Sequence, residues 1–352
     1  MTAGNVQDLG IPEMLASTAD KYPSRTALAY VDGDVFTYAQ LQNRVAGLCS
    51  ILQEAGLKKG DKVAILSENS PQWGIVFLAA ASMGAVAVPI LTQFHSEAII
   101  HIIRHSEARA VFVSRSLYPK IQEAELKGLA LFYTDDFSQA EDSAEAGKGL
   151  KNAINTGFKG LDRLKQAAWK WANHGHAEKV KPDDLAVIVY TSGTTGNSKG
   201  VMLTHGNLLY DAARAGEIVS AGHEDRFLSI LPLAHTYECS LGLLAPLIHG
   251  ASVYYLREAP TPRILLPAMG KVQPTIVLMV PLIIEKIFKT RILPQLNKNK
   301  VLRAAYRIPF IRTRLHRLAG KKMMQSFGGR IKALCIGGAP LAGEAERFLR
   351  DA

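Results

Sequence analysis

The sequence predicts an α/β protein in which mostly parallel sheets are flanked by helices and arranged in two sub-domains. Short apolar runs rich in β-branched and aromatic residues alternate with longer amphipathic segments along most of the 352 residues. Several of these runs end directly at a proline, as residues 226–231 do at Pro232 and residues 275–280 at Pro281. Such alternation is typical of an open sheet covered by helices, where ligands bind at the carboxyl ends of the strands.

Turn and capping residues indicate where the first predicted strands and helices begin and end. Residues 26–31 and 35–38 flank Asp32-Gly33-Asp34, a hairpin signal, and Thr37 is a suitable cap for the helix that follows to about Ala55. The remaining strands are predicted at residues 62–67, 85–90, 109–114, 129–134, 185–190, 226–231, 251–256, 275–280 and 331–336. The remaining helices are predicted at residues 11–22, 71–83, 96–105, 118–125, 205–220, 240–247, 262–271, 282–293 and, interrupted by Pro309, 301–318.

Composition narrows the class of protein. Hydrophobic residues make up 48% and charged residues 20% of the chain, as in globular proteins. No apolar run approaches the ~20 residues of a membrane span, and the first residues do not resemble a secretory signal. The cysteines Cys49, Cys239 and Cys335 are too few and too far apart for a disulfide framework or a zinc site. We therefore expect a protein of the reducing cytoplasm.

The domain organisation is expected to follow the alternation of strands and helices. Residues 1–135 form a first α/β sub-domain, and residues 185–352 form a second that carries the candidate site. Residues 136–184 interrupt the pattern with a polar stretch rich in Gly, Ala and Lys. We interpret this stretch as a surface excursion or linker, with a docking surface as the alternative.

The most informative stretch follows the strand predicted at residues 185–190. A run of small and polar residues from Thr191 to Ser198 ends at Lys199 and leads into a second apolar run. Backbone N–H groups, hydroxyls and a lysine suit the binding of a polyanion. The pattern is not a Walker loop, because Ser198 precedes the lysine and Gly200 follows it. An ordinary flexible loop is the alternative interpretation.

The stretch YTSGTTGNSKGVMLTHGN resembles the signature loop of the adenylate-forming, or AMP-binding, superfamily, and within it the bacterial long-chain fatty-acid CoA ligases. One departure is Ser198, where proline is commoner. The resemblance implies the large N-terminal domain of the acyl-CoA synthetase/luciferase-like fold. It also implies that the loop holds the phosphates of ATP through Thr191, Ser192, Gly193, Thr194, Thr195, Gly196 and Lys199.

Two further motifs extend the resemblance. The sequence LPLAHTYE, residues 231–238, resembles the second core motif of the superfamily, in which a His or aromatic residue lies near the acyl carboxylate. This makes His235 a candidate catalytic residue, although a structural role is the alternative, and Glu238 is either a capping residue or a pocket carboxylate. The sequence IGGAPL, residues 336–341, resembles the turn that holds adenine. It contributes Gly337, Gly338, Ala339 and Pro340, for which a tight strand-to-helix turn is the alternative.

A basic block extends from Lys286 to Lys332, with fourteen Lys and Arg residues and no Asp or Glu. Without these fourteen residues the net charge of +10 would become −4. A solvated helical face, a contact with membrane surfaces and a site for the phosphates of CoA are all consistent with this block. Nucleic acid is not expected, because few aromatic residues and no recognised binding motif accompany the basic residues.

The resemblance implies ATP-dependent activation of a long-chain fatty acid to acyl-AMP and then to acyl-CoA, with Mg²⁺ and CoA taking part. The later family motif Y-G-x-T-E and the C-terminal catalytic lysine are not found, so the resemblance covers the N-terminal portion of the family. No metal-binding residue is therefore predicted, and these residues alone are expected to be inactive. The alternative is a non-catalytic nucleotide- or acyl-binding module that associates with membranes, peripherally at the inner membrane.

Overall fold

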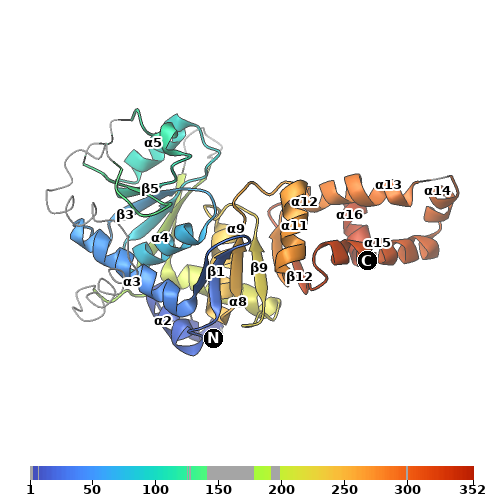
Figure 1. Cartoon of the computed structure of the whole chain (residues 1–352), viewed down its shortest axis with the longest axis horizontal. Coiled ribbons are helices and arrows are strands. Elements are labelled where there is room, and N and C mark those ends of the chain that lie inside the picture. The colour runs from blue at the N-terminus through green and yellow to red at the C-terminus, as the bar shows by residue number, and fades with distance from the viewer. Residues whose placement is uncertain are drawn as a thin grey trace. The chain divides into compact units, whose positions relative to one another are not determined.

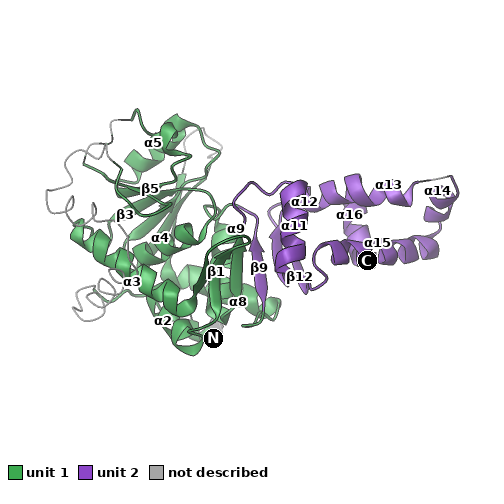
Figure 2. Cartoon of the chain, viewed as in Figure 1, with its two compact units in different colours: residues 1–224, 232–255 green, residues 225–231, 256–352 purple. Residues whose placement is uncertain are grey.

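The computed structural model describes residues 3–6, 8–124, 126, 128–140, 178–191, 199–298 and 300–352. The chain forms two compact units, coloured separately in Figure 2. Unit 1 comprises Met1–Glu224 and Pro232–Tyr255, and unit 2 comprises Asp225–Leu231 and Leu256–Ala352. Both units combine strands with helices, so the predicted α/β class is confirmed. Most of the excursion predicted at residues 136–184 lies outside the described residues.

Unit 1 contains a sheet of mostly parallel strands (Figure 1). Its neighbours are parallel throughout except for the last strand, which runs antiparallel to β7. In spatial order the strands are β6 (Ala130–Tyr133), β5 (Ala108–Val113), β3 (Lys62–Leu66), β4 (Val86–Pro89), β7 (Leu185–Thr191) and β8 (Lys199–Thr204). Strand β7 thus pairs with β4 from the first part of the chain, which places it in unit 1 rather than in the second sub-domain that the sequence predicted.

Three further strands of unit 1 form a second layer. Strand β1 (Thr26–Tyr30) runs parallel to β10 (Ser252–Tyr255) and antiparallel to β2 (Val35–Thr37), which confirms the predicted hairpin. Helix α3 (Tyr38–Glu54) begins at the predicted cap, because the Thr37 hydroxyl accepts a hydrogen bond from the Gln40 N–H. The other helical segments of unit 1 are α1 (Ala3–Val6), α2 (Ile11–Lys21), α4 (Pro71–Ser82), α5 (Ser96–His105), η1 (Tyr118–Lys120), α8 (His205–Ile218), α9 (Thr236–Glu238), η2 (Cys239–Leu244) and α10 (Ala245–His249).

Helix α4 is buried on every side. All of its residues from Trp73 to Ala81 are buried, and it contacts β3 and β4 of the first layer as well as β1 of the second. The Ser70 hydroxyl caps it by accepting the Trp73 N–H at 3.0 Å, and Pro71 occupies the first turn, where no N–H donor is needed. A helix that is apolar all round is stable only when neighbours cover all its faces, so α4 fixes the spacing of the two layers.

Unit 2 contains three parallel strands in the order β12 (Ala333–Ile336), β11 (Ile276–Met279) and β9 (Arg226–Ser229). Its helical segments are α11 (Pro262–Val272), α12 (Pro281–Ile287), η3 (Phe288–Ile292), α13 (Leu293–Leu296), α14 (Lys300–Tyr306), α15 (Pro309–Ser326) and α16 (Gly343–Asp351). Figure 1 shows α15 running back alongside α13, with α14 at the far end. The buried His316 ties this group together, since its ring bonds the Tyr306 hydroxyl and the Asp351 carboxylate, each at 2.8 Å.

Two predicted helices differ from the structure in form. Of the described residues 118–124, only Tyr118–Lys120 form a helical turn, η1, and the non-helical Leu126 packs against the core. The apolar segment predicted at 240–247 begins earlier and is π-helical over Cys239–Leu244 before α10 continues it. Among the described residues, no helix combines the length and the apolar character that crossing a bilayer requires.

His205 joins the start of α8 to the N-terminal part of unit 1. The Thr204 hydroxyl caps α8 as predicted, and the imidazole of His205 is fully buried behind it. Its Nδ1 accepts the Ile11 N–H at 3.3 Å, so that nitrogen must be unprotonated. Burial lowers the pKa of His205 to about 4, against the opposing effect of the Asp184 carboxylate.

We expect His205 to make unfolding depend on pH. Above its ordinary pKa of 6.5 the imidazole is neutral in both states; between 6.5 and about 4 the unfolded chain binds a proton that the folded chain excludes. Stability therefore falls as pH falls through this window, by an amount on the order of 3 kcal/mol. Urea unfolding at pH 7.5, 6 and 5 should show a smaller pH dependence for His205→Asn than for the wild type. The exposed control His101→Asn should retain the wild-type dependence, and equal slopes for all three proteins would exclude this role.

Candidate functional site

The candidate loop leaves and re-enters the sheet at neighbouring points. Strand β7 ends at Thr191 and β8 begins at Lys199, and these two residues are direct partners across the antiparallel pair. Both are exposed, whereas residues 186–190 of β7 are buried. The buried strand therefore holds the two ends of the loop together and leaves the Lys199 side chain open to solvent.

Gly200 allows β8 to lie unusually close to β7. A Cβ atom at this position would lie 2.8 Å from Cγ2 of Ile188 and 3.5 Å from the Tyr190 ring. Any larger residue would push the two strands apart immediately after Lys199. The glycine that distinguishes this sequence from a Walker loop thus has a packing role.

The side chain of Tyr190 holds the end of β7 against helix α5. Its hydroxyl lies 2.7 Å from Nδ1 of His105 on α5, and the two rings meet edge to face with centroids 5.7 Å apart. Burial raises the pKa of Tyr190, so the hydroxyl is neutral at ordinary pH. Sequence reasoning did not single out this contact, since 85 residues separate its partners.

His235, the predicted catalytic residue, is exposed and lies just before α9. It is held by its backbone, because its N–H donates to the Pro232 carbonyl and its own carbonyl accepts the Cys239 N–H, both at 2.9 Å. The segment before it is fixed by Asn69, whose side-chain oxygen accepts the Leu233 N–H at 2.8 Å. Asn69 positions the motif, and the sequence offered no signal for this role.

Glu238, whose role the sequence left open, is completely buried. Its carboxyl group lies over Gly242, where a Cβ atom would be 2.6 Å from the carboxyl carbon. Burial, and after it the charge of Glu238, raises the pKa of Cys239 to about 12, so this thiol is protonated at ordinary pH. Glu238 does not cap α9 through a side-chain hydrogen bond; it belongs to the interior around the π-helical segment η2.

The second glycine motif follows β12 in unit 2. The Gly337 N–H donates to the Met279 carbonyl at 3.1 Å, which continues the pairing of β12 with β11. Gly338 has a φ of +89°, a conformation that favours glycine, and the turn exposes it together with Ala339 and Pro340. The turn therefore presents exposed backbone with little side-chain bulk, which a ligand can approach closely.

The predicted site residues therefore divide between the two units. Thr191, Lys199 and His235 belong to unit 1, whereas the turn from Gly337 to Pro340 belongs to unit 2. Five of the predicted loop residues lie outside the described residues: Ser192, Gly193, Thr194, Thr195 and Gly196. Within the described part of the chain, no three His, Cys, Asp or Glu side chains gather closely enough to hold a metal ion.

Comparison with known families supports the interpretation of this site. The family described as AMP-binding enzyme matches residues 15–352, which is nearly the whole chain. The chain belongs to the AMP-binding enzyme family. The resemblance inferred from the three motifs is thereby confirmed.

Curated relatives of this family member include proteins named as acyl-CoA ligases or synthetases. The chain is 30% identical over 336 residues to the human long-chain-fatty-acid–CoA ligase 1, an alignment covering 88% of this chain and 47% of the relative. It is 31% identical over 270 residues to the putative acyl-CoA synthetase YngI of Bacillus subtilis, covering 70% of this chain and 47% of the relative. The chain thus spans about half the length of these relatives.

Solved structures with the same fold include N-terminal domains of adenylate-forming enzymes. The N-terminal domain of FACL13 from Mycobacterium tuberculosis superimposes with a TM-score of 0.70 at 21% identity, covering 97% of this chain and 73% of that one. The ATP-bound MatB from Rhodopseudomonas palustris gives a TM-score of 0.68 at 22% identity, covering 96% and 57%. These likenesses confirm the predicted fold, an N-terminal domain of this superfamily.

Proposed function

We propose that this chain supplies the nucleotide-binding part of an enzyme that activates a long-chain fatty acid to acyl-AMP and then to acyl-CoA. The observation that carries the proposal is the pairing of Thr191 with Lys199. This pairing places the exposed Lys199 beside the end of the buried strand β7. Family membership supports the use of ATP, and the relatives that are named long-chain-fatty-acid–CoA ligases favour this acyl substrate.

In the proposed first step, a fatty-acid carboxylate attacks the α-phosphate of ATP and pyrophosphate leaves. All reacting groups are anionic, so the work of the protein is to position them and to offset their charge. Lys199 and the loop from Thr191 to Gly196 would bind the β- and γ-phosphates, while the turn from Gly337 to Pro340 would hold the adenine. Mg²⁺ would be bound together with the phosphates, whose oxygens are the ligands that this ion prefers.

In the proposed second step, the thiol of CoA attacks the acyl carbon and AMP leaves. The exposed His235 would act earlier, in the first step, where its ring would lie beside the acyl carboxylate and orient it for attack. We expect the enzyme to act in the cytoplasm and to contact the inner membrane peripherally.

The proposal predicts that Lys199→Ala weakens ATP binding without unfolding the protein. A charge-assisted hydrogen bond contributes about 1.5–3 kcal/mol, so the ATP dissociation constant measured by calorimetry should rise about tenfold or more. Because Lys199 is exposed, the melting temperature without ligand should barely change. Lys181→Ala removes another exposed lysine of unit 1 and should leave ATP affinity unaltered. An unchanged affinity in Lys199→Ala would refute the assignment.

We also propose that residues 1–352 by themselves form acyl-CoA only slowly. The transition state concentrates negative charge on the α-phosphate, and the loop and turn bind the flanking phosphates and the adenine rather than that atom. Loss of one preorganised donor typically costs about 10²–10³ in rate. Pyrophosphate exchange and thioester formation, compared between these residues and a full-length relative, should differ by at least this factor; comparable rates would contradict the proposal. Exchange without thioester formation would still exclude the non-catalytic alternative.

A second proposal concerns the basic block from Lys286 to Lys332, which we expect to contact anionic membranes. The exposed face of α15 carries Phe310, Arg314, Arg317, Leu318 and Lys321, at spacings that repeat with the helical turn. Phe310 and Leu318 are 70% and 62% exposed, and the Arg314 guanidinium lies over the Phe310 ring. Apolar side chains between cations are typical of helices that lie in a membrane interface.

Co-sedimentation with lipid vesicles tests this contact. Each Lys or Arg near an anionic surface contributes about 1 kcal/mol, screened over ~8 Å at physiological salt, so binding to anionic vesicles should exceed binding to neutral ones and fall at high salt. Phe310→Glu should reduce pelleting several-fold, whereas Ile218→Glu, at an 80% exposed position of α8, should not. Equal pelleting with both vesicle types would rule the contact out.

A further inference from the structure

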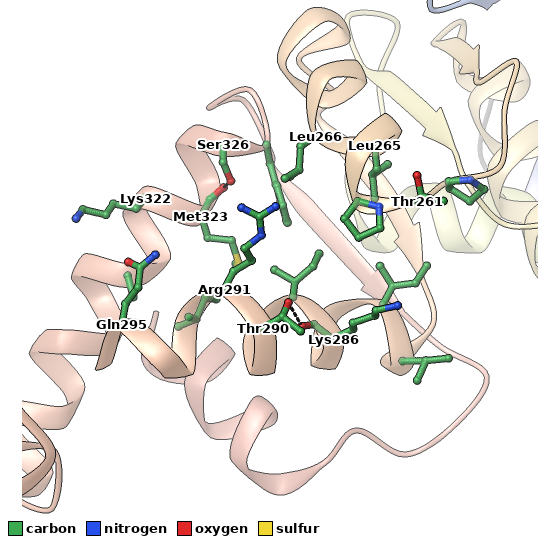
Figure 3. Close-up of a pocket in the computed structure, with 18 residues that line it drawn as sticks. Thr261, Leu265, Leu266, Lys286, Thr290, Arg291, Gln295, Lys322, Met323 and Ser326 are labelled. Atoms are coloured by element: carbon green, nitrogen blue, oxygen red, sulfur yellow. Dashed lines mark hydrogen bonds between the residues drawn. The ribbon is translucent and has the colours of Figure 1, made fainter. Parts of the chain in front are cut away.

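Unit 2 contains a cavity of about 460 Å³ between α11, the α12–η3 segment and α15 (Figure 3). Its volume falls within the range of about 300–1,000 Å³ that small-molecule sites occupy. None of the residues from Gly337 to Pro340 lines it, so it is separate from the turn proposed for adenine. No function in the preceding proposals uses this cavity.

The interior of the cavity is apolar. Its wall includes four apolar side chains that are each less than 10% exposed: Leu265, Ile292, Met323 and Phe327. They form an apolar surface to which three helical segments contribute. Such a surface excludes water and favours a hydrocarbon chain or ring over a polar ligand.

The charged groups at the cavity are all cationic, and neutral polar side chains line it as well, namely Thr261, Thr290, Gln295 and Ser326. Lys286, Arg291 and Lys322 line it, and no Asp or Glu does. None of the three forms an ion pair within the described residues, whereas the neighbouring Lys289 pairs with Glu285 at 3.8 Å. Figure 3 shows the Arg291 guanidinium pointing into the cavity toward the Ser326 side, while Lys322 lies at its outer end.

This combination selects one class of ligand. Arg291 is exposed, so water solvates its charge when the cavity is empty. A molecule with a hydrocarbon part and an anionic group fits this arrangement best, because its hydrocarbon part is removed from water by the apolar interior while its anionic group pairs with the guanidinium. The planar fork of arginine binds a carboxylate or a phosphate through two parallel hydrogen bonds. Lysines at the rim add attraction without fixing the geometry of the head group.

We propose that this cavity binds a single-chain amphiphile with a carboxylate or phosphate head. Arg291 binds the head group, and the chain lies against Leu265 and Phe327. The residues that line the site all lie between 260 and 327, and none of them is among the residues proposed to bind ATP. It would retain an acyl ligand on the enzyme whether or not ATP is bound.

Calorimetry with the whole 352-residue chain, without ATP, tests the proposal. Dodecanoate, dodecyl phosphate and dodecanol are titrated below their critical micelle concentrations, since the first two distinguish the head group and the third lacks the charge. At least one anionic probe should bind about tenfold or more tightly than dodecanol, the ratio expected from a charge-assisted pair. Arg291→Gln should abolish this difference, and Lys289→Gln, a charge removed from the same segment outside the cavity, should preserve it.

A second variant separates the cavity from any other acyl site in the chain. Ala319 lines the cavity and is only partly exposed, so Ala319→Phe fills it while leaving every cation in place. This variant should lose binding of the anionic probe while ATP affinity and the far-ultraviolet circular dichroism spectrum stay unchanged. Anionic binding that survives both Arg291→Gln and Ala319→Phe, or equal binding of all three probes, overturns the proposal; loss of ATP binding in Lys199→Ala bears only on the nucleotide site.

Discussion

Burial of helix α4 on all sides is the constraint on which unit 1 depends. Its residues from Trp73 to Ala81 contact β3 and β4 on one side and β1 on the other. Both strand layers therefore pack against the same apolar helix. Gly74 shows how close this packing is, because a Cβ atom there would lie 3.1 Å from Leu28 and 3.6 Å from Leu243. In an interior packed this closely, a change in volume of even one methylene group affects stability. The strands that pack against α4 are therefore rigid, and they support the loops at their ends.

The candidate site uses that rigidity through β7. The strand is buried between β4 and β8, and its last residues are held by the Tyr190–His105 hydrogen bond and by the close approach of Gly200. Rigid strands therefore determine where Thr191 and Lys199 lie, while the loop between them carries the hydroxyls and N–H groups. Functional groups placed on loops above a rigid scaffold are the usual arrangement in α/β proteins. The same logic applies in unit 2, where the pairing of β12 with β11 fixes the backbone that leads into Gly337.

The helices of unit 2 carry apolar side chains on their buried faces and basic side chains on their exposed faces. Phe288, Phe327 and Phe348 are completely or almost completely buried, and His316 links α14, α15 and α16 through two side-chain hydrogen bonds. Apart from the partly buried Arg312, the basic residues between Lys286 and Lys332 are exposed, and three of them line the cavity. The segment contains no acidic residue, and acidic residues outside it pair with Lys289 and Lys332. Lys286, Arg291 and Lys322 form no ion pair within the described residues, so their positive charge is available to anionic partners.

The sequence by itself determined the fold class, most elements, the helix caps at Thr37 and Thr204 and the family, because these depend on local periodicity, capping chemistry and contiguous motifs. It did not determine that β7 joins the first sheet, that Asn69 fixes the segment before His235, or that Glu238 is interior. Nor did it indicate a cavity inside the basic block. Each of these features joins residues far apart in the chain, so only the tertiary packing that closes those distances could decide them.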